Sequence, residues 1–278
     1  MEEKPDSWPH KAYKNLDFLN SAEARKIRVL SEMTEPEYRF RQHNIQDTIV
    51  IFGSARTIHA DEAKQRLKAI EERIRSKPGD ERADAAELRL ARSRVKLSPY
   101  YQATVDLAHE LTKWSLSLKE EHQRFVVCSG GGPGIMEAAN RGASEAGGTS
   151  IGLGISLPFE QHLNPYIPRD LQFEFHYFFV RKYWFMLLAK CLVAMPGGFG
   201  TMDELFEVLT LIQTHKVQKA VPIVLFGSEF WDDIINFDAF VDWGVISPED
   251  INLYRKMDTV AEARDYIIEY LTQAYLEQ

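Results

Sequence analysis

The sequence predicts an α/β protein with a Rossmann-like, doubly wound, mainly parallel sheet and helices on both faces. Short β-rich apolar runs alternate with longer helical patterns, which is typical of a parallel sheet. Most of the runs also end in glycine, serine or arginine, as expected where ligands bind at the carboxyl ends of strands. The strands are predicted over 48–52, 125–128, 150–155, 173–179, 191–195 and 221–226. The helices between them are predicted over 101–117, 135–146, 183–190 and 202–215.

Two segments fall outside this alternation and set the expected domain organisation. Residues 1–46 are polar with scattered aromatic side chains and are predicted to form an N-terminal helical extension. Residues 58–97 are rich in Arg, Lys, Glu and Ala, with apolar residues at helical spacing, which predicts an inserted antiparallel helical hairpin. A solvated hairpin or oligomer contact is favoured there over a regulatory surface. The Rossmann-like domain is then expected to span 47–278.

The composition restricts the classes of ligand. The chain of 278 residues is 45% hydrophobic, enough for a sizeable core, and carries a formal net charge of −8. This charge argues against nucleic-acid and membrane partners and leaves small anionic metabolites as candidates. Residues 1–10 lack the apolar core of a signal peptide, so a cytoplasmic location is expected. Cys128 and Cys191 are expected to be reduced and buried, and neither a metal nor another cofactor is predicted.

Two glycine-rich turns follow predicted strands. The first reads S-G-G-G-P-G over 129–134, and the second reads P-G-G-F-G-T-M-D-E over 196–204. Glycines let backbone N–H groups approach a ligand closely, and the N-terminus of the following helix favours an anion. Ile135 stands where a dinucleotide motif needs its third glycine, and no glycine is followed by Lys-Ser or Lys-Thr as in a P-loop. Each turn alone could equally be a tight connection, but two at neighbouring strand ends favour a monophosphate.

Arg181 and Glu204 are the candidate catalytic residues, and each has a structural alternative. Glu204 lies one helical turn into the helix after the second glycine turn, where Thr201-Met202-Asp203-Glu204 also matches a capping box. Arg181 follows the fourth predicted strand and could be half of a surface ion pair. On pattern alone the cap is favoured for Glu204, and only the whole set of motifs favours a catalytic pair.

Taken together, the motifs resemble the Lonely Guy (LOG) family, whose members often carry a lysine decarboxylase label. The resemblance covers roughly residues 47–228 and rests on Gly53-Ser54, on 129–138, on Arg181-Lys182 and on the P-G-G-x-G-T-x-x-E element. It implies a nucleoside 5′-monophosphate phosphoribohydrolase, which releases a free base and ribose 5-phosphate; in plants and some microbes the base is an active cytokinin. AMP or an N6-substituted AMP is the implied substrate, and a homo-oligomer, a dimer or higher, is implied as well. Nothing in the chain marks a Schiff-base lysine with a pyridoxal-phosphate site.

The resemblance also implies roles for individual residues. Arg181 and Glu204 would be the catalytic pair. Glu204 would stabilise an oxocarbenium-like transition state at C1′ and activate water, and Arg181 would either orient Glu204 or bind the ribose hydroxyls and phosphate. The implied substrate-binding residues are Gly53, Ser54, Gly131, Gly132, Lys182, Met195, Pro196, Gly197, Gly198, Gly200 and Thr201.

Two other functions stay open. A non-catalytic protein resembling molybdenum-cofactor carriers would share the fold and the glycine turns, but it would have no reason to keep Arg181 and Glu204 together. A phosphoribosyltransferase would run related chemistry toward synthesis, but the chain has no paired acidic residues after an apolar strand. The hairpin at 58–97 departs from the family pattern. Whether the aromatic segment 173–179 faces the core or the base pocket is not decided by the sequence.

Overall fold

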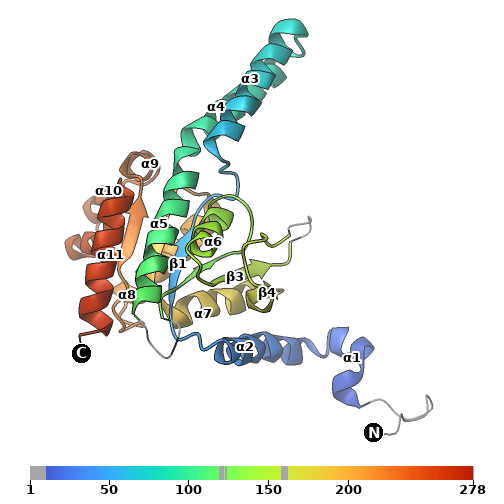
Figure 1. Ribbon diagram of the computed structural model, residues 1–278, viewed down its shortest axis with the longest axis vertical. Coiled ribbons are helices and arrows are strands. Elements are labelled where there is room, and N and C mark those ends of the chain that lie inside the picture. Colours follow the sequence, from blue (N-terminus) through green and yellow to red (C-terminus); the bar gives the residue numbers. More distant parts are fainter. Residues whose placement is uncertain (1–10, 119–121, 123, 158–161, 278) are drawn as a thin grey trace.

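A seven-stranded parallel sheet forms the centre of the protein (Figure 1). The computed structural model describes residues 11–118, 122, 124–157 and 162–277, and within them the strand order is β4-β3-β2-β1-β5-β6-β7, with every neighbouring pair parallel. The predicted fold class is confirmed. The strands are β1 (Thr48–Phe52), β2 (Val126–Ser129), β3 (Ser150–Ile155), β4 (Gln172–Phe175), β5 (Ala189–Ala194), β6 (Ile223–Phe226) and β7 (Tyr254–Met257).

Helices occupy most of the remaining described chain. The 3-10 helices are η1 (Ala12–Lys14), η2 (Arg169–Leu171) and η3 (Pro248–Leu253). The α-helices are α1 (Leu16–Asn20), α2 (Arg25–Gln42), α3 (Ala60–Ser76), α4 (Glu81–Leu97), α5 (Pro99–Ser117), α6 (Ile135–Glu145), α7 (Phe178–Leu188), α8 (Phe199–Gln213), α9 (Ser228–Ile234), α10 (Phe237–Asp242) and α11 (Val260–Tyr275). None of these described helices combines the length and the apolar character needed to cross a membrane. Residues 1–10, on which the expected lack of a signal peptide rests, lie outside the described residues.

The sheet is covered on both faces because residues along each strand alternate between two cores. In β1, Ile49 and Ile51 belong to a core built with α5, α6 and α11, whereas Val50 and Phe52 belong to a core built with α2, α7, α8, α9 and α10. A strand buried on both faces reads as a continuous apolar run, which makes such strands predictable. The two cysteines are free and buried, as expected, one in each core.

The direction in which the strands are added reverses between β1 and β5. From β1 the chain proceeds to β2, β3 and β4 on one side and then returns to place β5, β6 and β7 on the other. Such a switch point leaves a crevice at the carboxyl ends of the two central strands. The turns after these strands are tied together, because the N–H of Met195 donates to the carbonyl of Phe52 over 2.8 Å and the N–H of Ser54 donates to that of Pro196 over 3.0 Å.

Three predictions about the elements are wrong, and two of them concern the candidate site. The strand predicted over 173–179 ends at Phe175, and α7 begins at Phe178, so Arg181 lies in the first turn of a helix. The helix predicted over 202–215 begins earlier, at Phe199. β7 is missing from the prediction because its sequence, Tyr-Arg-Lys-Met, exposes two charged side chains at the edge of the sheet and contains no apolar run.

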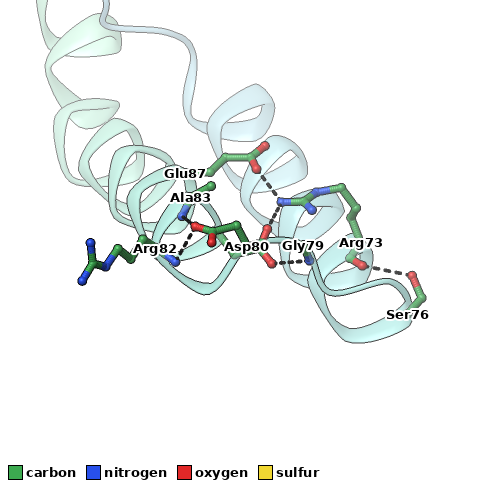
Figure 2. A network of polar contacts seen from close by, with 8 residues as sticks. Arg73, Ser76, Gly79, Asp80, Arg82, Ala83 and Glu87 are labelled. Atoms are coloured by element: carbon green, nitrogen blue, oxygen red, sulfur yellow. Dashed lines mark hydrogen bonds and ion pairs between the residues drawn. The ribbon is translucent and has the colours of Figure 1, made fainter.

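Helices α3 and α4 form an antiparallel hairpin that projects from the body of the protein after β1 (Figure 1). Polar contacts close its tip (Figure 2): Asp80 caps the start of α4, and Arg73 pairs with Glu87 and, over 2.8 Å, with Asp84. At the opposite end α4 continues almost directly into α5 through Ser98, which has helical dihedral angles. The hairpin is therefore anchored by a long helix that packs against α6.

Candidate active site

A cavity of about 940 Å³ runs along the carboxyl ends of the strands. Residues at the ends of β4, β3, β2, β1 and β5 line it, together with residues of α4, α7, α8 and α9. Parallel sheets flanked by helices bind their ligands at this edge. The turns after β1, β2 and β5 and the start of α7 meet in this one cavity, as the sequence predicts for a common crevice.

The turn after β1 lies between the two glycine-rich turns. Gly53 passes so close to the start of α6 that a Cβ there would lie 2.5 Å from Cγ2 of Ile135. The carbonyl of Ser54 accepts a hydrogen bond from the N–H of Ile135 over 3.1 Å, while its N–H donates to Pro196. Its hydroxyl oxygen accepts a bond from the N–H of Arg56 over 3.1 Å. Ser54 thereby ties the N-terminus of α6 to the loop that leads into α8.

The second glycine turn opens the N-terminus of α8 toward the cavity. Gly198 is the N-cap residue and has no side chain to cap the helix, so the N–H groups of the first turn lack an intrahelical partner. A Cβ at Gly197 would lie 2.1 Å from Oγ1 of Thr201, whereas a Cβ at Gly198 or Gly200 would meet nothing within 4 Å. Unpaired N–H groups, an open approach and the partial positive charge of the helix end are what a phosphate group requires.

Arg181 and Glu204 form an ion pair in the wall of the cavity. Nη2 of Arg181 donates to Oε1 of Glu204 over 2.9 Å, and the two side chains are only 12% and 7% exposed. Since α8 begins at Phe199 with Gly198 as N-cap, Glu204 lies in the second turn. The capping box considered for Thr201 to Glu204 therefore does not form, and the carboxylate contacts Arg181 instead.

Burial shifts the pKa values of both partners toward their neutral forms. Desolvation raises the pKa of Glu204 although the charge of Arg181 acts in the opposite direction. Desolvation likewise lowers the pKa of Arg181 against the attraction of Glu204. Burial thus disfavours the two charges by more than their attraction offsets, so the pair is poorly explained as a stabilising contact. Perturbed ionisable groups in a cleft are typical of functional sites.

Helix α2 holds the start of α7, which carries Arg181. The carboxylate of Glu32 accepts hydrogen bonds from the N–H groups of His176 and Tyr177 over 2.9 and 3.2 Å. The carbonyl of Glu32 accepts a bond from the indole N–H of Trp184 over 2.9 Å. No side chain within α7 caps this helix, so the carboxylate of Glu32 supplies the acceptors for backbone donors at its start.

The protein satisfies the guanidinium group of Arg181 only in part. Its Nε is buried and has no hydrogen-bond partner among the described residues. The group lies 5.3 Å from the ring centroid of Phe178 and 5.5 Å from that of Phe185, contacts that fix its orientation. Phe178 lines the cavity, whereas Phe173 and Phe175 belong to the core. The aromatic segment before Arg181 therefore serves both the core and the cavity.

Most of the residues that the sequence predicts for binding and catalysis line the cavity. They are Gly53, Ser54, Gly132, Arg181, Pro196, Gly197, Gly198, Gly200, Thr201 and Glu204. Three others do not. Gly131 has a φ of +71° and its N–H is bonded within its own turn. Lys182 is rotated about 100° from Arg181 on α7 and pairs with Asp203 and Glu207 over 2.7 and 3.0 Å. Met195 is fully buried in the core.

Sequence reasoning missed further cavity residues on several elements. Among them are Leu90, Ser93, Arg94 and Leu97 on α4, Gly154 and Ile155 on β3, Gln172 and Glu174 on β4, and Phe230 and Ile234 on α9. The four residues of α4 recur at i, i+3, i+4 and i+7, so they form one face of the helix, and this spacing is a signal that the sequence does contain. The residues of β4 and α9 carry no comparable pattern, because they reach the cavity only through the tertiary arrangement.

The side chains around the cavity limit the chemistry that it can support. None of the described residues that line it is a lysine or a cysteine. Across the described part of the chain, no group of three or more His, Cys, Asp or Glu side chains is placed to hold a metal ion. The cavity does offer the carboxylates of Glu204 and Glu174, the imidazole of His162, guanidinium groups and the N-termini of two helices.

Comparison with known sequences gives consistent matches. The family model described as "Possible lysine decarboxylase" matches residues 136–267. The cytokinin riboside 5′-monophosphate phosphoribohydrolase LOG3 of Arabidopsis thaliana is 28% identical over 189 residues, which is 64% of this chain and 79% of the relative. The phosphoribohydrolase LOG5 of the same plant is 28% identical over 158 residues, which is 56% of this chain and 64% of the relative.

Comparison with solved structures gives weaker matches. The X-ray structure of the structural genomics target TM1055 has a TM-score of 0.47 at 19% identity and covers 80% of this chain and 99% of that one. The molybdenum cofactor binding protein of the phototrophic bacterium Rippkaea orientalis has a TM-score of 0.41 at 20% identity, covering 61% of this chain and 89% of that one. The Moco carrier protein of Chlamydomonas reinhardtii has a TM-score of 0.40 at 24% identity, covering 61% and 88%.

Proposed function

Because the resemblance of this chain to the Lonely Guy family is confirmed by the family model and the plant relatives, we propose that it hydrolyses the N-glycosidic bond of a nucleoside 5′-monophosphate. The products are a free base and ribose 5-phosphate, and AMP or an N6-substituted AMP is the proposed substrate. One observation carries the proposal: the buried pair of Arg181 and Glu204 shares a cavity with the open N-terminus of α8. A phosphate at that N-terminus places the ribose beside a carboxylate of the same helix.

Glu204 is the proposed catalytic carboxylate. When the bond between C1′ and the base nitrogen breaks, its electron pair leaves with the base and positive charge develops at C1′ and the ring oxygen. The ionised carboxylate stabilises this charge and accepts a proton from the water that attacks C1′, and the departing base takes up a proton. A carboxylate that is 7% exposed acts in a medium of low dielectric constant, where its attraction for the transition state is strong.

Arg181 and the glycine turns supply orientation. Through its Nη2 bond to Oε1, Arg181 fixes one oxygen of Glu204 and favours the ionised form. The side chain of Arg181 is 12% exposed and lines the cavity, so its guanidinium group can donate to a ribose hydroxyl. The phosphate contributes binding energy away from the reacting atom, which holds C1′ against the carboxylate and raises the rate of the chemical step. Nucleosides without a phosphate are therefore expected to react far more slowly than monophosphates.

The decarboxylase label of the matching family model is not adopted, because amine chemistry of that kind needs a reactive lysine in the site. No described lysine lines the cavity. Burial lowers the pKa of Lys219 to about 8, but its ammonium donates to the carbonyls of Met186 and Leu187 at the end of α7, outside the cavity. Lys182 is held by two carboxylates. These lysines have structural partners rather than access to a substrate.

Release of free base, followed by chromatography, tests the proposal directly. AMP, N6-isopentenyl AMP, GMP and CMP are compared, with adenosine as the matched substrate that lacks only the phosphate. We expect base release from at least one adenine monophosphate and a much lower rate from adenosine. Comparable rates from AMP and adenosine would contradict the proposed role of the phosphate. Nucleotide binding without base release would instead favour a carrier function.

A further inference from the structure

The cavity continues past the phosphate cradle. The cavity crosses the ends of strands that are neighbours in the sheet. Neighbouring strands lie about 4.8 Å apart, so the strand that a residue follows gives its position along the cavity. Arg181 belongs near β2, since its Nη1 lies 3.9 Å from the position of a Cβ on Gly130. The open N-terminus of α8 follows β5. The next step leads toward β6, where α9 and α4 line the cavity with Phe230, Ile234 and Arg94.

One face of α4 forms this end of the cavity. The lining residues Leu90, Ser93, Arg94 and Leu97 lie at the spacing of neighbours along one side of a helix. The opposing apolar stripe of α4 is occupied by other residues, such as the buried Ala91, and packs against α3. The face with Arg94 is therefore not needed to close the hairpin and is free to contact a ligand.

The position of Arg94 is fixed by the fold. Two residues further along α4, Lys96 pairs with Glu229 over 2.7 Å and lies 3.8 Å from Asp233, which joins α4 to α9. Ser98 then continues the helical path into α5. The hairpin thus places Arg94 on a rigid element, which is a more precise support than a loop.

Two arginines that line the cavity have no partner among the described residues, one on α4 and one in the turn after β1. The turn after β1 lies beside the phosphate cradle, because the N–H of Ser54 is bonded to Pro196 in the turn that leads into α8. Arg94 is partly buried and Arg56 is exposed in the turn after β1, and both line the cavity. Within the described residues neither guanidinium group has an ion pair or a hydrogen bond, in contrast to Arg181, which pairs with Glu204. A guanidinium group presents a planar fork of donors that matches a phosphate. Two unpaired forks beside one phosphate cradle provide more positive charge than a monophosphate needs.

We infer that Arg56 and Arg94 form a second anion subsite, which binds the outer phosphate of a nucleoside 5′-diphosphate. The inference rests on the proposed function, which sets the orientation of the nucleotide. The ribose lies beside Glu204, the first phosphate lies at the N-terminus of α8, and the second phosphate lies between the two arginines. With this subsite, the cavity accepts nucleoside diphosphates as well as the monophosphates of the proposed function.

Calorimetric titration with AMP and ADP tests the subsite. The full chain with Glu204→Gln is used in every titration, so that neither nucleotide is consumed. We expect ADP to bind about tenfold more tightly than AMP, which corresponds to about 1.4 kcal/mol. Adding Arg94→Ala should bring the ratio of the two dissociation constants close to one, and Arg94→Lys, which keeps the charge but loses the fork, should give an intermediate ratio.

Arg92→Ala is the matched control, because it removes the same charge from the same helix. Arg92 lies 4.0 Å from Glu71 of α3 and does not line the cavity, so the ratio should stay at its original value. The inference is overturned if ADP binds no more tightly than AMP, or if Arg92→Ala and Arg94→Ala lower the ratio equally. Base release from AMP by the unaltered protein reports on the proposed function alone, so the two can fail separately.

Discussion

Replacing Glu204 with glutamine is the sharpest test of the proposed chemistry, because it removes a charge and almost nothing else. The amide keeps an oxygen that can accept the Nη2 bond of Arg181, which now spans 2.9 Å to the carboxylate. It cannot stabilise positive charge at C1′ as an anion, and it cannot take a proton from water. Loss of a catalytic acid–base group lowers rates by about 10²- to 10⁴-fold, so kcat/KM for AMP should fall by that factor, or roughly 3–5 kcal/mol in activation free energy.

The same substitution should leave the free energy of unfolding at neutral pH unchanged or raise it. Burial raises the pKa of Glu204 despite the charge of Arg181, so the folded protein favours the protonated carboxyl group, which the neutral amide resembles. The amide oxygen also remains an acceptor for the guanidinium group of Arg181, whose side chain is 12% exposed.

Glu207→Gln is the matched control for both measurements. Glu207 lies on the same helix, 3.0 Å from Lys182, and does not line the cavity. Base release is followed by chromatography, and stability by urea unfolding. The control should keep its kcat/KM and lose less than about 1 kcal/mol, as a partly exposed ion pair does. The catalytic assignment is refuted if Glu204→Gln retains kcat/KM within tenfold of the unmodified protein, or if the control loses as much.

Four further predictions concern the pH dependence of activity, the pH dependence of stability, the second glycine turn and Glu32. Since burial raises the pKa of Glu204 above 4.5 and the ionised form is active, kcat/KM for AMP should fall as pH drops through that raised pKa, and the residual activity of Glu204→Gln should lack this limb. The raised pKa also means that the stability contributed by Glu204 is present below pH 4.5 and is lost as pH rises through the folded-state value, so urea titrations of the unmodified protein should lose stability relative to Glu204→Gln over that interval. Gly197→Ala should destabilise the protein, because its Cβ would lie 2.1 Å from Oγ1 of Thr201. Gly200→Ala should leave the melting temperature unchanged or higher but weaken AMP binding. Equal effects of the two substitutions would count against a phosphate site at the start of α8. Glu32→Ala should lower kcat/KM by releasing the start of α7, with the melting temperature reduced by the loss of two hydrogen bonds; full activity would show that Arg181 is held without them.

The sequence is sufficient for the parts of the fold that rest on local patterns. Strands buried on both faces, such as β1 and β3, are recognisable as apolar runs. The glycine-rich turns after β2 and β5 are recognisable from their backbone chemistry. The exposed edge strand β7 has no such run. The start of α7 is hidden because Phe178 and Phe179 extend an aromatic run that favours a strand, although both residues are exposed on a helix.

The candidate site is predictable where a side chain belongs to a turn and unpredictable where it depends on distant packing. Glu204 could be a cap or a catalytic acid until the start of α8 at Phe199 decides between them. Lys182 does not line the cavity, because α7 is a helix at that point and directs its side chain away from Arg181. Arg94 comes to the cavity because α4 runs into α5 and pairs with α9, contacts that no local pattern records. Homo-oligomerisation and the cytoplasmic location stay predictions.

The contacts of Glu32 have a consequence for what counts as the smallest working unit of this protein. The matching family model spans 136–267 and contains both catalytic candidates. Yet the helix that presents Arg181 is fastened from residue 32, and the cavity is bounded by the turn after β1 and by α4, all of which precede that span. A fragment limited to residues 136–267 would keep Arg181 and Glu204 but lose the contacts of Glu32 that hold the start of α7. The part of the chain needed for function is therefore longer than the part that matches the family model. Truncated variants should keep α2, which carries Glu32.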